Sequence, residues 1–146
     1  MKTIFLILSC SLLFFGCSGS RPGHLGVREG KLASCPDSPN CVSTQAADEK
    51  HRIEPMAFRG SLKETRERLL EIIRSMKRAQ VIRSGGDYIH AEFTSALFRF
   101  VDDGEFYLDE TTNTVHMRSA SRVGHSDLGV NRKRMEAIRA AFLRKE

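Results

Sequence analysis

The spacing of apolar residues predicts the first elements of the chain. The segment Ile53 to Phe58 has the composition of a short strand. Ser61-Leu62-Lys63-Glu64 is a capping box, in which the serine and glutamate side chains satisfy free backbone N–H groups, so we expect a helix to begin there. The apolar stripe of that helix consists of Leu62, Leu69, Ile72, Ile73 and Met76. These residues predict a helix that buries one face.

After this helix the chain consists of short strand-like segments separated by turn residues. Val81 to Arg83 predicts one strand, and Ser84-Gly85-Gly86-Asp87 predicts a turn. Four or five short strands then follow without a helix between them, which predicts an antiparallel meander. We expect a last helix to begin at Ser126 or Asp127 and to bury a face made of Val130, Met135, Ile138 and Phe142.

Two loops define the expected register of the meander. We expect Asp102-Asp103-Gly104 to form a three-residue hairpin loop, because its glycine can adopt the left-handed conformation. This loop pairs Phe100 with Phe106. A four-residue loop at residues 110–113 then pairs Phe106 with Met117. One face of the predicted sheet is therefore apolar and packs against both helices, as an α+β fold requires.

The opposite face of the predicted sheet is polar. With a tight turn at Ser95-Ala96, the same register places Glu92 across from Arg99 and Glu105 across from Arg118. Such pairs are either a solvated exterior or the lining of a concave ligand surface. The candidate surface consists of His90, Glu92, Arg99, Glu105, Tyr107 and His116.

The densest polar block runs from Arg118 to Arg139, where a strand ends and the last helix begins. Free backbone N–H groups at a helix N-terminus favour an anion, and nearby arginines add to that preference. The alternative is that Asp127 caps the helix and pairs internally with an arginine. The candidate anion-binding residues are Arg118, Ser119, Ser121, Arg122, Asn131 and Arg132.

The N-terminal residues predict export and a lipid anchor. Residues 1–16 have a positive start at Lys2, an apolar segment and a small Gly16, which is the layout of a secretory signal. The site resembles the lipobox of bacterial lipoproteins, in which the following cysteine, here Cys17, receives fatty acyl chains including palmitate. Ser18 after the cysteine favours the periplasmic face of the outer membrane. The alternatives are an uncleaved anchor or an ordinary secreted protein.

Composition limits the remaining possibilities. The formal charge is +5, and it becomes +4 when residues 1–16, which include Lys2, are removed. This charge is mildly basic, so nucleic acid is not an expected partner. Residues 17–31 are rich in Gly, Ser, Arg and Pro and predict a flexible lipidated tether. Residues 32–146 are enough for a single domain with one modest core.

Two further cysteines predict a disulfide. Cys35 and Cys41 should pair in an oxidising compartment. Five residues separate them, which does not match the close spacing of zinc motifs, and no neighbouring histidine completes a ligand set. We therefore expect neither a metal nor another cofactor.

Several motifs in order resemble one uncharacterised family, the one numbered 1499 among domains of unknown function. The resemblance spans about Leu32 to the C-terminus and departs at Gly104, where we expect a larger apolar residue in the family. It implies a domain of bacterial envelopes and plastids, with no established activity, cofactor or catalytic residue. The motifs are Cys35-Pro36, Asn40-Cys41-Val42-Ser43, Asp87-Tyr88-Ile89-His90, Phe98-Arg99-Phe100-Val101-Asp102-Asp103, Arg118-Ser119-Ala120-Ser121-Arg122-Val123-Gly124 and Asp127-Leu128-Gly129-Val130-Asn131-Arg132.

The sequence favours binding over catalysis. His125-Ser126-Asp127 has the residue types of a catalytic triad, but adjacent side chains point apart. We expect a lipid-anchored envelope protein that binds a lipid-like or anionic ligand; the alternatives are a structural or protein-interaction lipoprotein and, third, a hydrolase. The element order resembles a reduced helix-grip arrangement, so a lipid binder requires a cavity beside Phe98, Phe100 and Phe142.

Overall fold

The computed structural model describes residues 19–144. The expected signal peptide and the lipidation site at Cys17 lie outside the described residues. Among residues 19–144, no helix is both long enough and apolar enough to cross a bilayer.

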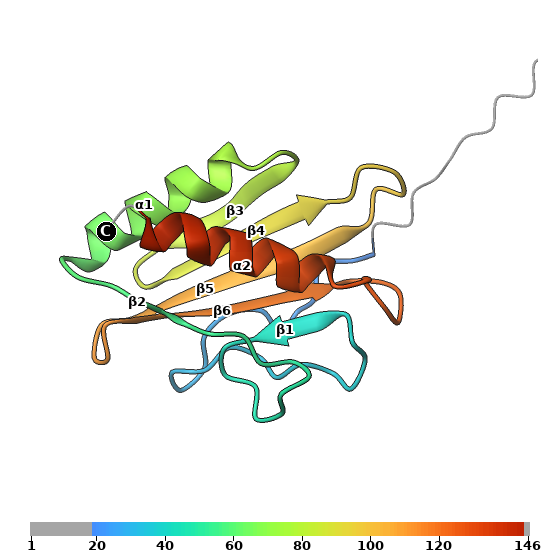
Figure 1. The fold of residues 1–146 in the computed structure, drawn as a ribbon, viewed down its shortest axis with the longest axis horizontal. Helices are drawn as coiled ribbons and strands as arrows, with labels where there is room; N and C mark the ends of the chain where they lie inside the picture. Colours follow the sequence, from blue (N-terminus) through green and yellow to red (C-terminus); the bar gives the residue numbers. More distant parts are fainter. Residues whose placement is uncertain (1–18, 145–146) are drawn as a thin grey trace, which may run out of the picture.

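One antiparallel sheet carries both helices on a single face (Figure 1). The strand order is β1-β6-β5-β4-β3, and β2 also pairs with β6. The predicted α+β class and the meander, here β3 to β6, are confirmed. The elements are β1 (Cys41–Ser43), β2 (Met56–Ala57), α1 (Leu62–Ser75), β3 (Ala79–Gly85), β4 (Tyr88–Thr94), β5 (Val101–Asp109), β6 (Thr114–Ser121) and α2 (Val130–Leu143).

The first helix begins as its capping box predicts. The Ser61 side chain accepts a hydrogen bond from the Glu64 N–H, and the Glu64 carboxylate accepts one from the Ser61 N–H. Burial of the stripe fixes α1 on the sheet and completes a core that α2 shares. Leu69, Ile72 and Ile73 are buried, and Leu62 and Met76 are partly buried; the core also contains Phe106, Met117, Met135, Ile138 and Phe142.

The prediction of a hairpin loop at Asp102-Asp103-Gly104 is wrong. These residues lie inside β5, where Asp103 pairs with Glu92 and Gly104 with Ala91, and Gly104 is not left-handed. The chain turns earlier, at residues 95–100, where Ser95 donates to the carbonyl of Phe100 at 2.8 Å. This longer loop lets all seven residues of β4 pair with β5. Arg99 therefore lies in the loop and does not face Glu92.

The β5–β6 register agrees with the prediction. Phe106 pairs with Met117 and Glu105 with Arg118, and the connection spans residues 110–113. On its other side, Tyr107 of β5 pairs with Tyr88 of β4.

The start of α2 differs from the prediction in two ways. The N-cap is Gly129, in the left-handed conformation with φ 77°, while the Asp127 carboxylate accepts hydrogen bonds from the N–H groups of Gly129 and Asn131. Val130 is 45% exposed, and Asn131 is fully buried in its place. The buried face of α2 is therefore rotated by one residue at its first turn.

The segment before β1 lies against the sheet face that the helices leave open. Arg21 donates to the Glu92 carboxylate at 2.9 and 2.5 Å, and the backbone N–H of Gly26 donates to Glu105 at 2.8 Å. Further along, the N–H of Leu32 donates to Gln45. We expected a flexible tether over residues 17–31, but residues 21–31 pack against the sheet. We call residues 21–31 the N-terminal cover.

Candidate functional site

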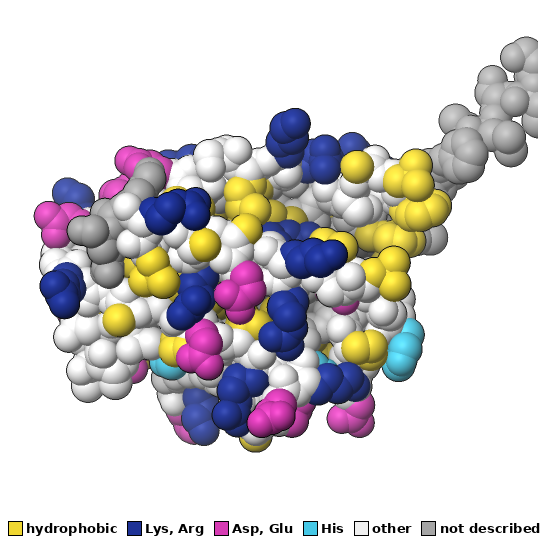
Figure 2. All heavy atoms as spheres, in the orientation of Figure 1, with side chains coloured by type: hydrophobic (Ala, Val, Ile, Leu, Met, Phe, Trp, Pro, Cys, Tyr) yellow, Lys and Arg dark blue, Asp and Glu magenta, His cyan; other side chains and the backbone are white. Residues whose placement is uncertain are grey.

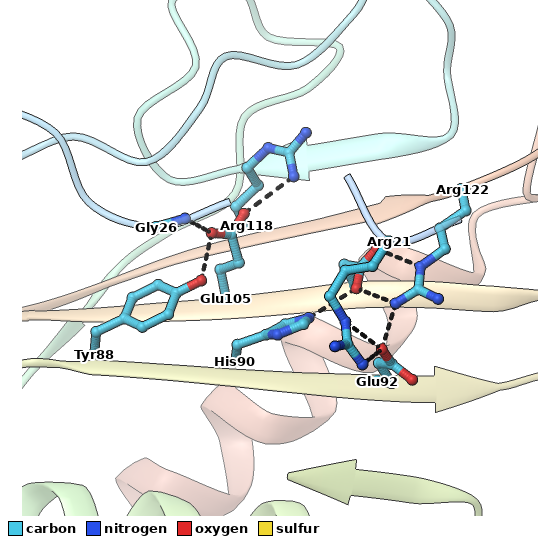
Figure 3. A network of polar contacts seen from close by, with 9 residues as sticks. Arg21, Gly26, Tyr88, His90, Glu92, Glu105, Arg118 and Arg122 are labelled. Atoms are coloured by element: carbon cyan, nitrogen blue, oxygen red, sulfur yellow. Dashed lines mark hydrogen bonds and ion pairs between the residues drawn. The ribbon is translucent and has the colours of Figure 1, made fainter. Parts of the chain in front are cut away.

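A polar network lies on the sheet face under the N-terminal cover (Figure 3). Alternation along β4, β5 and β6 turns one set of polar side chains away from the helices. The cover buries most of this set, so the network is not a solvated exterior. Its central members are His90, Glu92, Asp103, Glu105, Arg118 and Arg122.

Glu105 is the most buried charge of the network, with an exposed fraction of 0%. One carboxylate oxygen accepts hydrogen bonds from the Tyr88 hydroxyl at 2.7 Å and from the Gly26 N–H. The other oxygen accepts from Nη1 of Arg118 at 3.2 Å. Burial and the adjacent Glu105 raise the pKa of Tyr88 far above its ordinary value, so its hydroxyl stays protonated and donates.

The second half of the network centres on Arg122. Its guanidinium donates to Asp103 at 2.8 Å and to Glu92 at 2.5 Å, while His90 lies 2.7 Å from Asp103. Burial by itself would raise the pKa of Asp103 and of Glu92, but the hydrogen bonds and charges of their partners outweigh it and lower both pKa values. The hydrogen bond with Asp103 also raises the pKa of Arg122. All three groups are therefore charged at neutral pH.

The lowered pKa values predict acid destabilisation. The stability contributed by Asp103 and Glu92 is complete above their ordinary pKa values of 3.8 and 4.5 and is lost as the pH falls through the lower values of the folded state. Asp103→Asn should therefore flatten the dependence of the free energy of unfolding on pH in this range, as measured by urea denaturation. Asp37→Asn, at an exposed position, is the matched control and should keep the wild-type slope. Equal slopes for both variants would contradict the prediction.

The three ligand types His90, Glu92 and Asp103 bring donor atoms within 4.8 Å of one another, which is the geometry of a metal site. However, Arg122 donates to both carboxylates and Arg21 donates to Glu92. A divalent ion would have to displace two guanidinium groups, so we interpret the group as an ion-pair network.

A second polar cluster lies on the other face of the sheet, under the first turn of α2. Asp102 accepts hydrogen bonds from Ser121 at 2.6 Å and from Arg134 at 2.7 Å. Asn131 accepts from Ser119 at 2.5 Å and donates to Ser121 and to the backbone carbonyl of Asn40, the residue before β1. This cluster fastens α2 to the sheet.

The six candidate anion-binding residues therefore do not converge. Arg118 and Arg122 lie on the covered face, whereas Ser119, Ser121 and Asn131 lie on the helix face. Arg132 donates at 2.7 Å to each of two backbone carbonyls, those of Lys50 and Arg52. The internal pairing of arginines that we weighed as the alternative does occur, although with Glu92, Asp103, Glu105 and Asp102.

Two other predicted residues lie apart from the network. His116 stacks on Tyr107 with ring centroids 6.0 Å apart, and burial lowers the pKa of His116 despite the nearby Asp109.

In the triad-like segment, the Ser126 hydroxyl accepts a hydrogen bond from the Leu128 N–H, and the Asp127 carboxylate accepts one from the Asn131 N–H at the start of α2. Neither side chain therefore activates the other. Sequence reasoning missed Arg21, Tyr88 and Arg134, for which no local pattern exists.

A pocket of ≈ 330 Å³ opens beside the network, between the N-terminal cover and the loop closed by the Cys35–Cys41 disulfide. Arg118 contributes to its wall; Nη1 of this residue is bonded to Glu105, while the buried Nε has no hydrogen-bond partner among residues 19–144. Exposed His24 lies at the same pocket. We call this cavity the arginine pocket. Its lining consists of Pro22, His24, Ser34, Cys35, Pro36, Asp103, Arg118, Ala120, Ser121 and Arg122.

Comparison with known proteins identifies the family and no activity. A search of curated proteins found no match to the chain. Residues 31–142, which include every strand and nearly all of both helices, match the sequence model of one family. The motifs quoted above fall at β1, at the start of β4, at the loop into β5 and at the junction of β6 with α2. The chain therefore belongs to the family described as Protein of unknown function (DUF1499).

Proposed function

We propose that this protein is a lipid-anchored protein of the bacterial cell envelope that binds a small anion, a carboxylate or phosphate, in the arginine pocket. The observation that carries the proposal is the incomplete pairing of Arg118. Its side chain is only 3% exposed, yet its buried Nε has no hydrogen-bond partner within residues 19–144. A buried N–H without a partner is costly, and an anion oxygen that reached it from the pocket would satisfy it.

The chemistry of the pocket favours an anion. A guanidinium has five N–H donors in a planar fork, which matches the two oxygens of a carboxylate or phosphate. Arg122 adds a second guanidinium at the wall, and the His24 ring also lines the pocket. In a partly buried pocket such bonds are stronger than in water. A volume of ≈ 330 Å³ suits a small ligand.

The binding part of the proposal is tested by titrating inorganic phosphate into the mature chain while recording the Nε–Hε signals of arginine by NMR. We expect a saturable shift of the Arg118 signal. Arg118→Lys keeps a cation beside Glu105 but removes the fork, and it should weaken phosphate binding by about tenfold. Arg132→Lys, which changes an arginine bonded to backbone carbonyls elsewhere, is the matched control. A linear shift, or equal affinity in both variants, would refute an anion site.

The anchoring part rests on Gly16-Cys17 after an apolar segment. The Cys35–Cys41 disulfide agrees with an oxidising compartment outside the cytoplasm. We expect the wild-type chain to incorporate labelled palmitate and to fractionate with membranes, and Cys17→Ser to lose both properties. Palmitate incorporation that persists in Cys17→Ser would place the acyl group elsewhere.

The structural alternative has one observation in its favour. A lipid binder of the helix-grip type requires a cavity beside Phe98, Phe100 and Phe142, but Phe142 is fully buried in the core while Phe98 and Phe100 are exposed. Met135 and Ile138 are likewise fully buried and belong to the same core cluster as Phe142. If phosphate does not bind, this packed interior favours an envelope scaffold that acts through its surface.

A further inference from the structure

One end of the molecule carries a cluster of exposed apolar side chains. Leu97 is 79% exposed and Leu128 is 88% exposed. We name this cluster the apolar tip; it consists of Leu97, Phe98 and Phe100 in the β4–β5 loop and of Leu128 and Val130 at the start of α2. Figure 2 shows apolar side chains gathered at this end, at the right of the view. A cluster of this kind marks an interaction surface.

The tip is built from two loops that meet around a groove of ≈ 430 Å³. Phe98 and Phe100 stack with ring centroids 5.6 Å apart, and Val123 completes the wall from the β6–α2 loop. The hydrogen bonds between Ser95 and Phe100 close the first loop, so its apolar side chains point outward on a fixed base. Both loops project from the same end of the sheet (Figure 1).

The N-terminal chain joins the domain at this same end. Gly19 lies so close to the β6–α2 loop that a Cβ on it would be 2.9 Å from Cβ of Arg122 and 3.0 Å from Cγ1 of Val123. Val123 is also a wall of the groove. Cys17 is two residues before Gly19, and two residues reach about 7 Å at most. An acyl group on Cys17 is thus tied to the edge of the apolar tip.

Charge at the tip also suits a bilayer. Arg99 lies between the two phenylalanines in the chain; it is exposed and has φ 58°. Arginine and aromatic side chains together are typical of the interface between lipid headgroups and acyl chains, where the guanidinium can reach the phosphates. The two acids that line the groove are engaged: Asp102 pairs with Arg134, and Asp127 binds backbone N–H groups. The tip therefore combines apolar side chains with one cation. Neither Asp102 nor Asp127 leaves a free carboxylate there to repel anionic lipid.

We infer that the apolar tip inserts into the lipid bilayer beside the acyl anchor and sets the orientation of the domain on the membrane. The inference rests on the proposed acylation of Cys17. A bilayer is favoured over a protein partner because the acyl anchor would hold the bilayer next to the tip. Contact between the tip and the lipid would then be effectively intramolecular. In this orientation residues 110–113, which connect β5 and β6 at the opposite end of the sheet, point away from the membrane.

The test uses the lipidated chain in vesicles of three parts phosphatidylethanolamine and one part phosphatidylglycerol. Leu97→Cys and Leu128→Cys introduce exposed thiols for an environment-sensitive fluorophore, while the Cys35–Cys41 disulfide stays oxidised. Thr111→Cys, in the β5–β6 turn, is the matched control. Lipids brominated on their acyl chains should quench the labels at 97 and 128 by about twofold or more and leave the label at 111 unchanged.

The outcomes separate this inference from the proposed anchoring. If the protein stays on the vesicles but the label at 97 is quenched no more than the label at 111, the tip does not enter the bilayer and the inference is overturned while the anchor stands. A label at 97 that is shielded from water without responding to brominated lipid would show that protein covers the tip, which also overturns the inference. A chain that is not retained on vesicles refutes both.

Discussion

Arg118→Met is expected to lower the free energy of unfolding by about 3–5 kcal/mol, the largest single effect in the covered network. The substitution leaves the Glu105 carboxylate with an exposed fraction of 0% and without its cation. The Tyr88 hydroxyl and the Gly26 N–H still donate to one carboxylate oxygen, but the other oxygen loses the 3.2 Å bond from Nη1. Urea denaturation at neutral pH, followed by circular dichroism, measures the loss.

A double variant shows whether the cost comes from the stranded charge. Arg118→Met with Glu105→Gln has no buried charge at this pair, so it should recover most of the lost stability. Arg139→Met is the matched control, because its ion pair with Glu136 is 3.9 Å long and partly exposed and contributes about 0–1 kcal/mol at most. If Arg118→Met costs no more than Arg139→Met, the pair is not a structural element and Glu105 needs no cation.

The parts of the fold that depend on local pattern were predictable. The capping box at Ser61 places the start of α1, and the alternation of Glu105, Phe106 and Tyr107 gives the correct β5–β6 register because the loop at residues 110–113 is short. A short loop fixes pairing within a few residues, so the apolar face and the Glu105–Arg118 pair follow from the sequence alone.

The β4–β5 hairpin was mispredicted for a physical reason. Asp102-Asp103-Gly104 has turn composition, yet each aspartate finds a cation that local sequence does not reveal: Arg134 for Asp102 and Arg122 for Asp103. These long-range pairs stabilise the aspartates inside a strand and outweigh the turn preference. The loop therefore moves to residues 95–100, and it takes Phe98 out of the predicted sheet and into the apolar tip.

The candidate site was half predictable. Strand alternation places Arg118 and Ser119 on opposite faces, so a single anion site containing both was excluded by the same rule that set the register. The N-terminal cover is different, because its contact with the most buried charge, Glu105, is the backbone N–H of Gly26, and any residue except proline has that donor. Such a contact leaves no trace in the pattern of side chains. The burial of the network thus required the structure.

Gly104→Val is expected to be the second most destabilising change, at about 1–3 kcal/mol. Gly104 lies inside β5 on the helix face, opposite Ala91, and a Cβ there would be 2.5 Å from Cε2 of Phe93 and 3.4 Å from Cε of Met135. A flexible methionine end can move, but the Phe93 ring is 97% buried and lies under the Arg134 guanidinium, 4.6 Å from its centroid. The ring therefore has little room to shift.

The resemblance to the family makes this position a sharp test, because a larger apolar residue is expected there in relatives. A larger residue at position 104 requires a smaller partner at position 93, since the two side chains occupy the same space between β4 and β5. Phe93→Leu removes the atom at 2.5 Å, so the double variant Gly104→Val with Phe93→Leu should be more stable than the sum of the single effects predicts. Additive losses in a thermal or urea unfolding cycle would contradict this steric coupling and would mean that β5 moves as a whole to accept the added methyl groups.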